Sequence, residues 1–388
     1  MRISMLKLER VGQIQEAAVE FGDLTVLVGP QATGKSIFLQ FLKLLLDVGY
    51  IHEQLRKHGI DWNRSLSDFL RVYLGEGMQN VWHSASGLTV NDCPFDIQEI
   101  ALVRNRSRDA KLFYIPAQRV LSLANGWPRP FTAFGSEDPF VVRDFSETFR
   151  ILMERELGRD EVLFPKTNRL KKEYRDLIAK HFFGGFGLQV DRHGSQKRLV
   201  LKNGQKHSAI PFMAWSAGQR EFVPLLMGLY WLMPAAKVSR RDPIQWVVIE
   251  EPEMGLHPSA ISVVVLLIAE LLWRGYRVCL STHSTHVIDL IWLLQTIRRH
   301  GGESQRFLDL FDIRKSDPVK EVAREVCQKE MRVYYFGKEG RAQDISNLDP
   351  GARNEVEAGW GGLTEWSGRV NELIASVVAD GKRQDQRT

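Results

Sequence analysis

A short glycine-rich segment of this 388-residue chain has the residue types and spacing that can hold a polyphosphate. It reads GPQATGKS and fits GxxxxGK[ST] at every fixed position. In such a loop, glycines let backbone N–H groups face a β-phosphate, and the N-terminus of the following helix adds positive potential. Lys35 would reach the β- and γ-phosphates, and the Ser36 hydroxyl would ligate Mg²⁺. The loop follows an apolar run and opens a helical one, so the sequence predicts that it binds ATP with Mg²⁺ through Gly29, Pro30, Gln31, Ala32, Thr33, Gly34, Lys35 and Ser36.

Two carboxylates and a histidine follow later apolar strands. Glu250 and Glu251 end the run WVVIEE, and His283 lies in LSTHS just past the next strand. Parallel strands deliver such groups to one sheet edge, beside a phosphate loop. We expect Glu250 on the metal side, Glu251 to polarise the attacking water and His283 to hydrogen-bond the γ-phosphate. The alternative for the acids is two surface carboxylates before a turn, and His286 is expected to be an ordinary side chain.

The order of the motifs resembles the ABC-type ATPases. Residues 215–220 (WSAGQR) look like the ABC signature, in which a serine and a glycine at a helix N-terminus bind the γ-phosphate held by another subunit. Residues 250–258 (EEPEMGLHP) are similar to the EEPExxLHP segment of the OLD-like and AAA-15/AAA-21 ATPases, relatives of the SMC and Rad50 proteins. Residues 114–119 (YIPAQR) resemble the segment that carries the Q-loop in that group. The likeness covers roughly residues 1–47, 111–120 and 187–300.

That resemblance implies further roles. Ser216 and Gly218 would contact the nucleotide of a partner subunit, which requires at least a homodimer. Gln118 would sense nucleotide and Mg²⁺, joining Ser36 and Glu250 on the metal side; the alternative is a strand-end residue that caps a turn. Leu256 and His257 would lie in the D-loop at the dimer seam, and a phosphate or interface contact by Arg119 stays open. Glu250 and Ala217 stand where transporter ATPases usually carry Asp and Gly, and both departures fit the OLD-like branch better.

Alternating strand and helix patterns predict the elements that position these residues. Apolar runs and turn signals indicate strands at 2–9, 13–20, 24–28, 111–116, 245–249, 276–281 and 331–336, and short strands within 87–103. Helical spacing indicates helices at 36–47, 51–74, 220–233, 259–273 and 285–300, and residues 187–212 read as a β-hairpin. This order predicts an α/β fold of the ABC ATPase type, with a mainly parallel sheet flanked by helices.

The expected organisation is an ATPase core interrupted by one insertion. Residues 1–119 would form lobe I with the phosphate loop, and residues 187–330 would form lobe II with the signature, the acidic strand and His283. An antiparallel β subdomain belongs to this core. Residues 120–186 would be a mainly helical insertion. Residues 331–388 would be a C-terminal cap, with Trp360 and Trp366 packing, followed by a frayed polar tail.

Composition limits the setting of the protein. The chain is 44% hydrophobic and 26% charged, with a formal net charge of +5, which fits an ordinary globular surface. The three cysteines form no CxxC pair, which argues against a disulfide framework or a cysteine zinc site and suits the cytoplasm. The N-terminus lacks a signal-peptide pattern, and the most apolar run, 260–273, is too short to span a bilayer. We therefore expect a cytoplasmic protein without a membrane segment.

The leading functional hypothesis is a nucleotide-dependent oligomeric sensor or scaffold. After His283 we find no DxD element of a TOPRIM nuclease, and the chain lacks the sustained heptads of an SMC arm. ATPases without their own effector resemble ATPase subunits of bacterial anti-phage systems such as the phage anti-restriction-induced system, which control a separate effector, for example a TOPRIM nuclease. The alternative is an SMC/Rad50-like DNA-handling ATPase, for which the basic residues 169–180 are the best support. The EEPEMGLHP segment argues against a transporter ATPase subunit.

Overall fold

The computed structural model describes residues 3–102, 109–158, 160–193, 196–203, 209–234, 240–313, 317–364 and 366–375. Its centre is a six-stranded sheet in which five strands run parallel and one edge strand is antiparallel. The strands lie in the order β16 (Ala342–Asp344), β15 (Met331–Phe336), β3 (Leu24–Val28), β14 (Arg277–Thr282), β13 (Trp246–Glu250) and β6 (Leu112–Ile115). The predicted α/β fold with a mainly parallel sheet is therefore confirmed.

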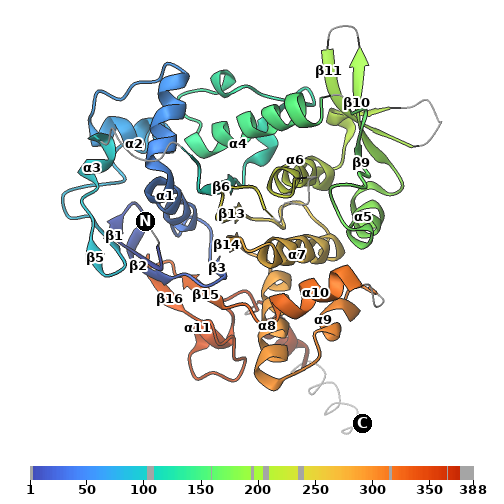
Figure 1. Ribbon diagram of the computed structural model, residues 1–388. Coiled ribbons are helices and arrows are strands. Elements are labelled where there is room, and N and C mark those ends of the chain that lie inside the picture. Colours follow the sequence, from blue (N-terminus) through green and yellow to red (C-terminus); the bar gives the residue numbers. More distant parts are fainter. Residues whose placement is uncertain are drawn as a thin grey trace, which may run out of the picture.

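Helices cover both faces of this sheet (Figure 1). Residues along β13 alternate between the two cores: Trp246 and Val248 pack with α1, whereas Val247 and Ile249 pack with α6 and α7. Burial on both faces explains why the parallel strands read as continuous apolar runs. The helices concerned are α1 (Lys35–Lys57), α6 (Ala217–Leu232), α7 (Pro258–Trp273) and α8 (Thr285–His300).

Two antiparallel sheets flank the central one. The predicted N-terminal hairpin is present, and it belongs to a sheet of β1 (Met5–Val11), β2 (Ile14–Glu20), β4 (Gly87–Val90) and β5 (Cys93–Pro94). The predicted 187–212 hairpin is present in a sheet of β9 (Val162–Phe164), β10 (Gly187–His193), β11 (Gln196–Lys202) and β12 (Ile210–Pro211). Residues 194–195 and 204–208, which contain parts of its two predicted turns, lie outside the described residues. A further pair joins β7 (Leu123–Ala124) and β8 (Trp127–Pro128).

Helix α1 is longer than the predicted 36–47 because it continues through a kink. Asp47 has non-helical angles of φ −126° and ψ 20°. Its carboxylate accepts hydrogen bonds from the N–H groups of Lys111 and Leu112 at the start of β6, and it pairs with the buried Lys43 at 2.8 Å. The kink therefore ties the phosphate-loop helix to a strand far away in the sequence.

The region between β6 and β9 is part of the core. Phe145 and Phe149 of α4 (Phe140–Ile151) are buried in the cluster that contains α6.

Residues 98–102 form a helix, so the expectation of short strands within 87–103 is wrong there. The expected 51–74 helix is wrong over residues 58–65, which separate the end of α1 from the helix Leu66–Leu74. The remaining elements are α2 (Leu66–Leu74), α3 (Gln98–Leu102), η1 (Arg119–Ser122), η2 (Phe131–Ala133), η3 (Leu152–Glu156), α5 (Lys172–Ile178), η4 (Ala179–Phe183), η5 (Phe212–Ala214), α9 (Gln305–Asp309), α10 (Asp317–Val326) and α11 (Glu355–Ala358).

The C-terminal part differs from the expected cap in two respects. Strand β15 pairs in parallel with β3, so it belongs to the central sheet. The expected end of the ATPase core at residue 330 therefore left out a strand of this sheet. Trp360 is buried and donates its indole N–H to Leu348, as expected for a packing residue, but Trp366 is 76% exposed, so its expected packing is wrong. The tail beyond residue 375 lies outside the described residues. Within the described ranges, no helix combines the length and apolarity needed to cross a bilayer.

Candidate nucleotide site

The phosphate loop connects β3 to α1 and is bent by three left-handed residues, Gly29, Ala32 and Gly34. Gly29 has φ 137°, and a Cβ there would lie 2.2 Å from the Phe336 carbonyl oxygen at the end of β15. This position therefore admits only glycine, for reasons of both backbone angle and space. Gly34 immediately precedes α1, so the helix N-terminus faces the loop as predicted.

The Lys35 ammonium lies inside the loop. It donates hydrogen bonds to the carbonyl oxygens of Gly29 at 2.8 Å and Pro30 at 2.6 Å, and its side chain is 5% exposed. Burial lowers the pKa of Lys35 to about 8, against the opposing attraction of Glu251, Glu253 and Glu250. A buried cation held by a loop of backbone groups is suited to a polyphosphate.

Glu250 lies behind the loop with one oxygen free to bind a cation. Its Oε2 accepts the N–H of Ala117 at 3.2 Å, while its buried Oε1 has no hydrogen-bond partner. Burial raises the pKa of Glu250, and the nearby Ser36 hydroxyl opposes that shift. An orphaned buried carboxylate oxygen beside a serine hydroxyl fits the oxygen ligands that Mg²⁺ prefers. Ser36 and Glu250 therefore lie close together, as the predicted Mg²⁺ site requires.

Glu251 and His283 meet at the carboxyl edge of the sheet. The Glu251 backbone is left-handed at φ 43°, and its Oε1 lies 3.5 Å from His283 Nε2. The His283 contact holds the pKa of the Glu251 carboxyl below its ordinary value, so this carboxylate is ionised at neutral pH. A strained backbone conformation at the end of a buried strand can fix the direction of one side chain. His286 instead contacts Ser262 of α7 at 3.1 Å, which agrees with an ordinary role.

Glu253 is a residue that the sequence analysis did not assign. One carboxylate oxygen accepts hydrogen bonds from the Thr282 hydroxyl at 2.8 Å and from the His283 N–H at 2.6 Å. It thus fixes the backbone that carries His283. The sequence pattern could have indicated this residue, because Glu253 is the last acid of the EEPE run.

The Q-loop candidate and its neighbour point in different directions. Gln118 is exposed at the N-cap position of η1, where its backbone carbonyl accepts the Leu121 N–H at 3.0 Å and its side chain makes no cap hydrogen bond. Its role in sensing nucleotide and Mg²⁺ stays a prediction. Arg119 is fully buried, so in this conformation its side chain does not make the phosphate or interface contact that the sequence left open. Its guanidinium donates to backbone carbonyls of Glu221, Glu250 and Glu251.

The signature residues begin α6. Ser216 is exposed and caps the helix by accepting the Gln219 N–H at 3.3 Å, and Gln219 completes the capping box. A Cβ at Gly218 would lie 2.9 Å from the Gly255 carbonyl oxygen, so the signature packs closely against the segment proposed as the D-loop. In that segment His257 caps α7 through Ser259.

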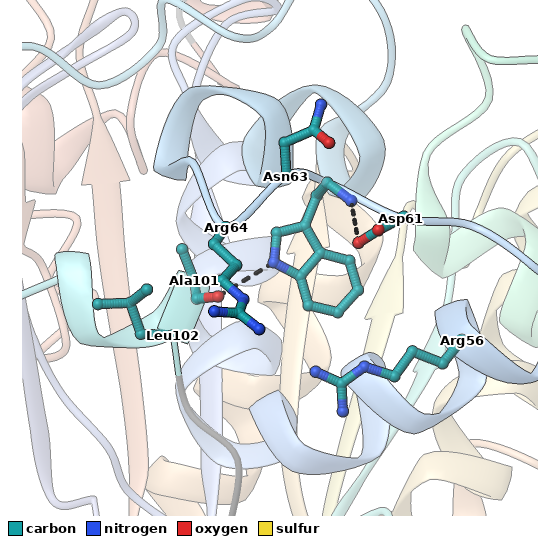
Figure 2. Close-up of a pocket in the computed structure, with 7 residues that line it drawn as sticks. Arg56, Asp61, Asn63, Arg64, Ala101 and Leu102 are labelled. Atoms are coloured by element: carbon teal, nitrogen blue, oxygen red, sulfur yellow. Dashed lines mark hydrogen bonds between the residues drawn. The ribbon is translucent and has the colours of Figure 1, made fainter.

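The cavity beside the phosphate loop is smaller than one found elsewhere. It measures ≈ 260 Å³ and is lined by Gln13, residues 31–37, Glu251 and His283. A cavity of ≈ 590 Å³ is lined by Trp62 together with Arg56 and Arg64 (Figure 2), and the Arg56 guanidinium lies 5.3 Å from the centre of the Trp62 ring. We take the smaller cavity as the candidate nucleotide site. Of these two cavities, it alone is lined by a buried lysine, an acid with a left-handed backbone and a histidine.

The basic segment 169–180 is engaged in internal contacts. Arg169 is buried and binds the carbonyl of Tyr230 and the carboxylate of Glu156. Lys171 pairs with Glu270 of α7 and lies over the Trp273 ring at 4.4 Å. Further contacts join Lys172 to Asp176 and Arg175 to the carbonyls of Leu170 and Thr167.

Comparison with known proteins matches part of the chain to a family of AAA domains. Residues 104–289 match the family described as "AAA domain, putative AbiEii toxin, Type IV TA system", which spans a little under half of the chain and excludes the phosphate loop itself. No curated protein matches the chain significantly. The OLD-like and anti-phage assignments therefore stay proposals.

Several solved structures resemble the chain at a distance. An SMC head bound to the C-winged helix domain of ScpA has 12% identity and a TM-score of 0.42, and the match covers 74% of this chain and 91% of that one. A dimeric bacterial ABC transporter cassette has 11% identity and a TM-score of 0.36, covering 88% and 98%. The SMC head domain from Thermotoga maritima has 12% identity and a TM-score of 0.31, covering 74% and 92%. At these TM-scores the likeness carries no argument about function.

Proposed function

We propose that this protein hydrolyses ATP in a site shared between two copies of the chain. The observation that carries the proposal is the division of the catalytic groups between two places. Lys35, Ser36, Glu251 and His283 surround one cavity, whereas no described residue lining that cavity comes from α6. Ser216 lies exposed at the start of α6, free to meet a phosphate held elsewhere.

The chain's own residues account for the steps of hydrolysis. Lys35 and the loop N–H groups bind the β- and γ-phosphates. Glu251, ionised at neutral pH, orients a water and takes its proton as the water oxygen bonds to the γ-phosphorus and the bond to the bridging oxygen breaks. His283 donates to the γ-phosphate and keeps Glu251 in place. Ser36, Glu250 and Gln118 are the residues proposed to hold Mg²⁺, which would neutralise charge on the phosphate oxygens.

A complementation experiment tests the shared site. Lys35→Ala should disable the phosphate loop and Ser216→Arg the signature, so each variant alone should be inactive. A mixture contains heterodimers in which one composite site keeps both an intact loop and an intact signature. We expect the mixture to recover up to about a quarter of wild-type turnover, because random pairing puts half of the chains into heterodimers with one good site each. A mixture as inactive as its components would contradict the proposal.

Ser65→Arg provides the matched control. Ser65 caps α2 through the Asp68 N–H much as Ser216 caps α6, so both substitutions remove a helix cap worth about 1 kcal/mol. The control should keep wild-type turnover. Equal loss of turnover in Ser65→Arg and Ser216→Arg would assign the effect to lost stability and would contradict a direct role of the signature.

In the cell, we propose that nucleotide-driven assembly of this ATPase controls a separate effector in anti-phage defence, such as a TOPRIM nuclease. Support comes from the resemblance of the EEPEMGLHP and YIPAQR segments to OLD-like ATPases and from the family description, which names a toxin of a Type IV TA system. The test is to purify tagged Glu251→Gln protein, expressed with its neighbouring genes, in Mg-ATP and to determine its mass under native conditions. A stoichiometric complex with an effector supports this role; a homodimer carrying DNA contradicts it.

A further inference from the structure

Arg119 is the most completely buried charged side chain near the site. It follows Gln118 directly and is 0% exposed. Nη1 donates to the Glu250 carbonyl at 3.0 Å, Nη2 to the Glu251 carbonyl at 3.1 Å, and Nε to the Glu221 carbonyl at 3.1 Å. The Glu221 carboxylate lies 3.5 Å from Nε. One guanidinium thus joins the end of β6, the end of β13 and the first turns of α6.

We propose that Arg119 is a positioning residue that couples the signature helix to the catalytic carboxylate of the same chain. This inference rests on the proposed hydrolysis at a shared site and specifies how that site is regulated. In a dimer, Ser216 would contact the nucleotide of one site while Glu251 acts on the nucleotide of the other. Arg119 spans the short path between these two residues and therefore links the two sites.

The residues at both ends of this path are closely packed and hydrogen-bonded. On the β13 side, Arg119 binds the carbonyls that flank the left-handed turn at Glu251, so its position sets the direction of that carboxylate. On the α6 side, Gly218 packs against Gly255, and a Cβ at Gly255 would lie 3.5 Å from Glu221 Cγ. Tight packing of this kind transmits small displacements instead of absorbing them.

The planar fork of arginine is needed for this arrangement. Three donors on one rigid plane reach three carbonyl oxygens on two separate elements, whereas a lysine ammonium is a point charge on a flexible stem. Arg119→Lys keeps the buried charge opposite Glu221 but cannot reproduce all three contacts. It therefore separates the positioning role from the charge itself.

The experiment measures steady-state ATP hydrolysis against ATP concentration, with binding of a fluorescent ATP analogue in parallel. For Arg119→Lys we expect kcat to fall about tenfold or more, KM and analogue affinity to stay within about threefold, and the Hill coefficient to fall from near two toward one. A loss of stability alone would lower the active fraction and leave the Hill coefficient unchanged.

Arg169→Lys is the matched control. Arg169 is also buried and also donates to backbone carbonyls at α6, but at the other end of the helix: those of Tyr230 and of its C-cap residue Met233. It should lose a similar amount of thermal stability and keep the wild-type Hill coefficient. If Arg119→Lys does not fold, Glu221→Gln tests the same link from α6, and it too should lower the Hill coefficient.

The outcomes separate this inference from the proposed function. An unchanged kcat and Hill coefficient in Arg119→Lys, or in Glu221→Gln where that variant is used, overturns the coupling. So does a wild-type Hill coefficient of one, although hydrolysis at a shared site would then still stand. Normal hydrolysis by Glu251→Gln would instead overturn the proposed chemistry.

Discussion

Replacing Glu251 by glutamine should separate ATP binding from ATP hydrolysis. The amide keeps the size of the side chain and leaves the backbone contacts of residue 251 intact, namely its N–H to Ser281 at 2.9 Å and its carbonyl to Arg119 at 3.1 Å. The side-chain contact that changes is the 3.5 Å approach to His283. Both of those side chains are partly solvated, so losing the contact costs at most about 1 kcal/mol.

The expected loss is therefore confined to proton transfer. An amide cannot accept the proton of the attacking water, and a positioned general base contributes roughly 10²- to 10⁴-fold. That range corresponds to about 3–5 kcal/mol of transition-state stabilisation at about 1.36 kcal/mol per tenfold. Affinity for ATP should change by less than about fivefold, since Lys35 and the loop are untouched.

Phosphate release in a single turnover measures the first quantity, and titration with a fluorescent ATP analogue measures the second. Light scattering in Mg-ATP should also detect a trapped dimer, because the nucleotide is bound and not consumed. Glu303→Gln, which removes an exposed acid after α8, is the control and should behave as wild type. A Glu251→Gln rate within tenfold of wild type would show that another group takes the proton.

Two further substitutions test the loop and its support. Lys35→Ala removes charge-assisted hydrogen bonds worth about 1.5–3 kcal/mol each, so ATP affinity should fall about a hundredfold or more in the same titration; retained tight binding would refute the assignment of the loop. Lys43→Met leaves Asp47 at the α1 kink and the nearby Asp144 without their buried cation, and urea unfolding should show a loss of about 3–5 kcal/mol; a loss under 1 kcal/mol would mean that the kink does not depend on this charge.

The phosphate loop and the acidic strand end could be predicted because their residues are contiguous. GPQATGKS carries its own turn chemistry, and WVVIEE marks a strand buried on both faces that ends in two acids. The edge at which Glu250, Glu251 and His283 meet follows from parallel topology alone. Local periodicity likewise gave the bounds of β3 and α8 correctly.

The features that sequence reasoning missed depend on partners distant in the chain. Asp47 leaves the helical conformation to accept the N–H groups of Lys111 and Leu112 at the start of β6, more than sixty residues later. Arg119 finds its partners on α6 and β13, over a hundred residues away. Nothing in the pattern around either residue encodes those contacts. The burial of Arg119 also reverses the usual expectation for a basic residue beside a phosphate site.

The basic segment 169–180, whose charges suggested a nucleic-acid face, also contacts partners that are distant in the chain. Arg169 binds the C-terminal end of α6, and Lys171 and Tyr174 both contact Glu270 of α7. These residues therefore hold the signature helix against its neighbour. Offering them to a phosphate backbone would require breaking buried ion pairs, which costs several kcal/mol. Lys172 and Lys180 are exposed, but Lys172 pairs with Asp176 and Lys180 lies on the short η4 turn. Two such charges add little affinity for DNA. The positive charge of this segment is therefore better explained by these internal contacts than by a nucleic-acid partner.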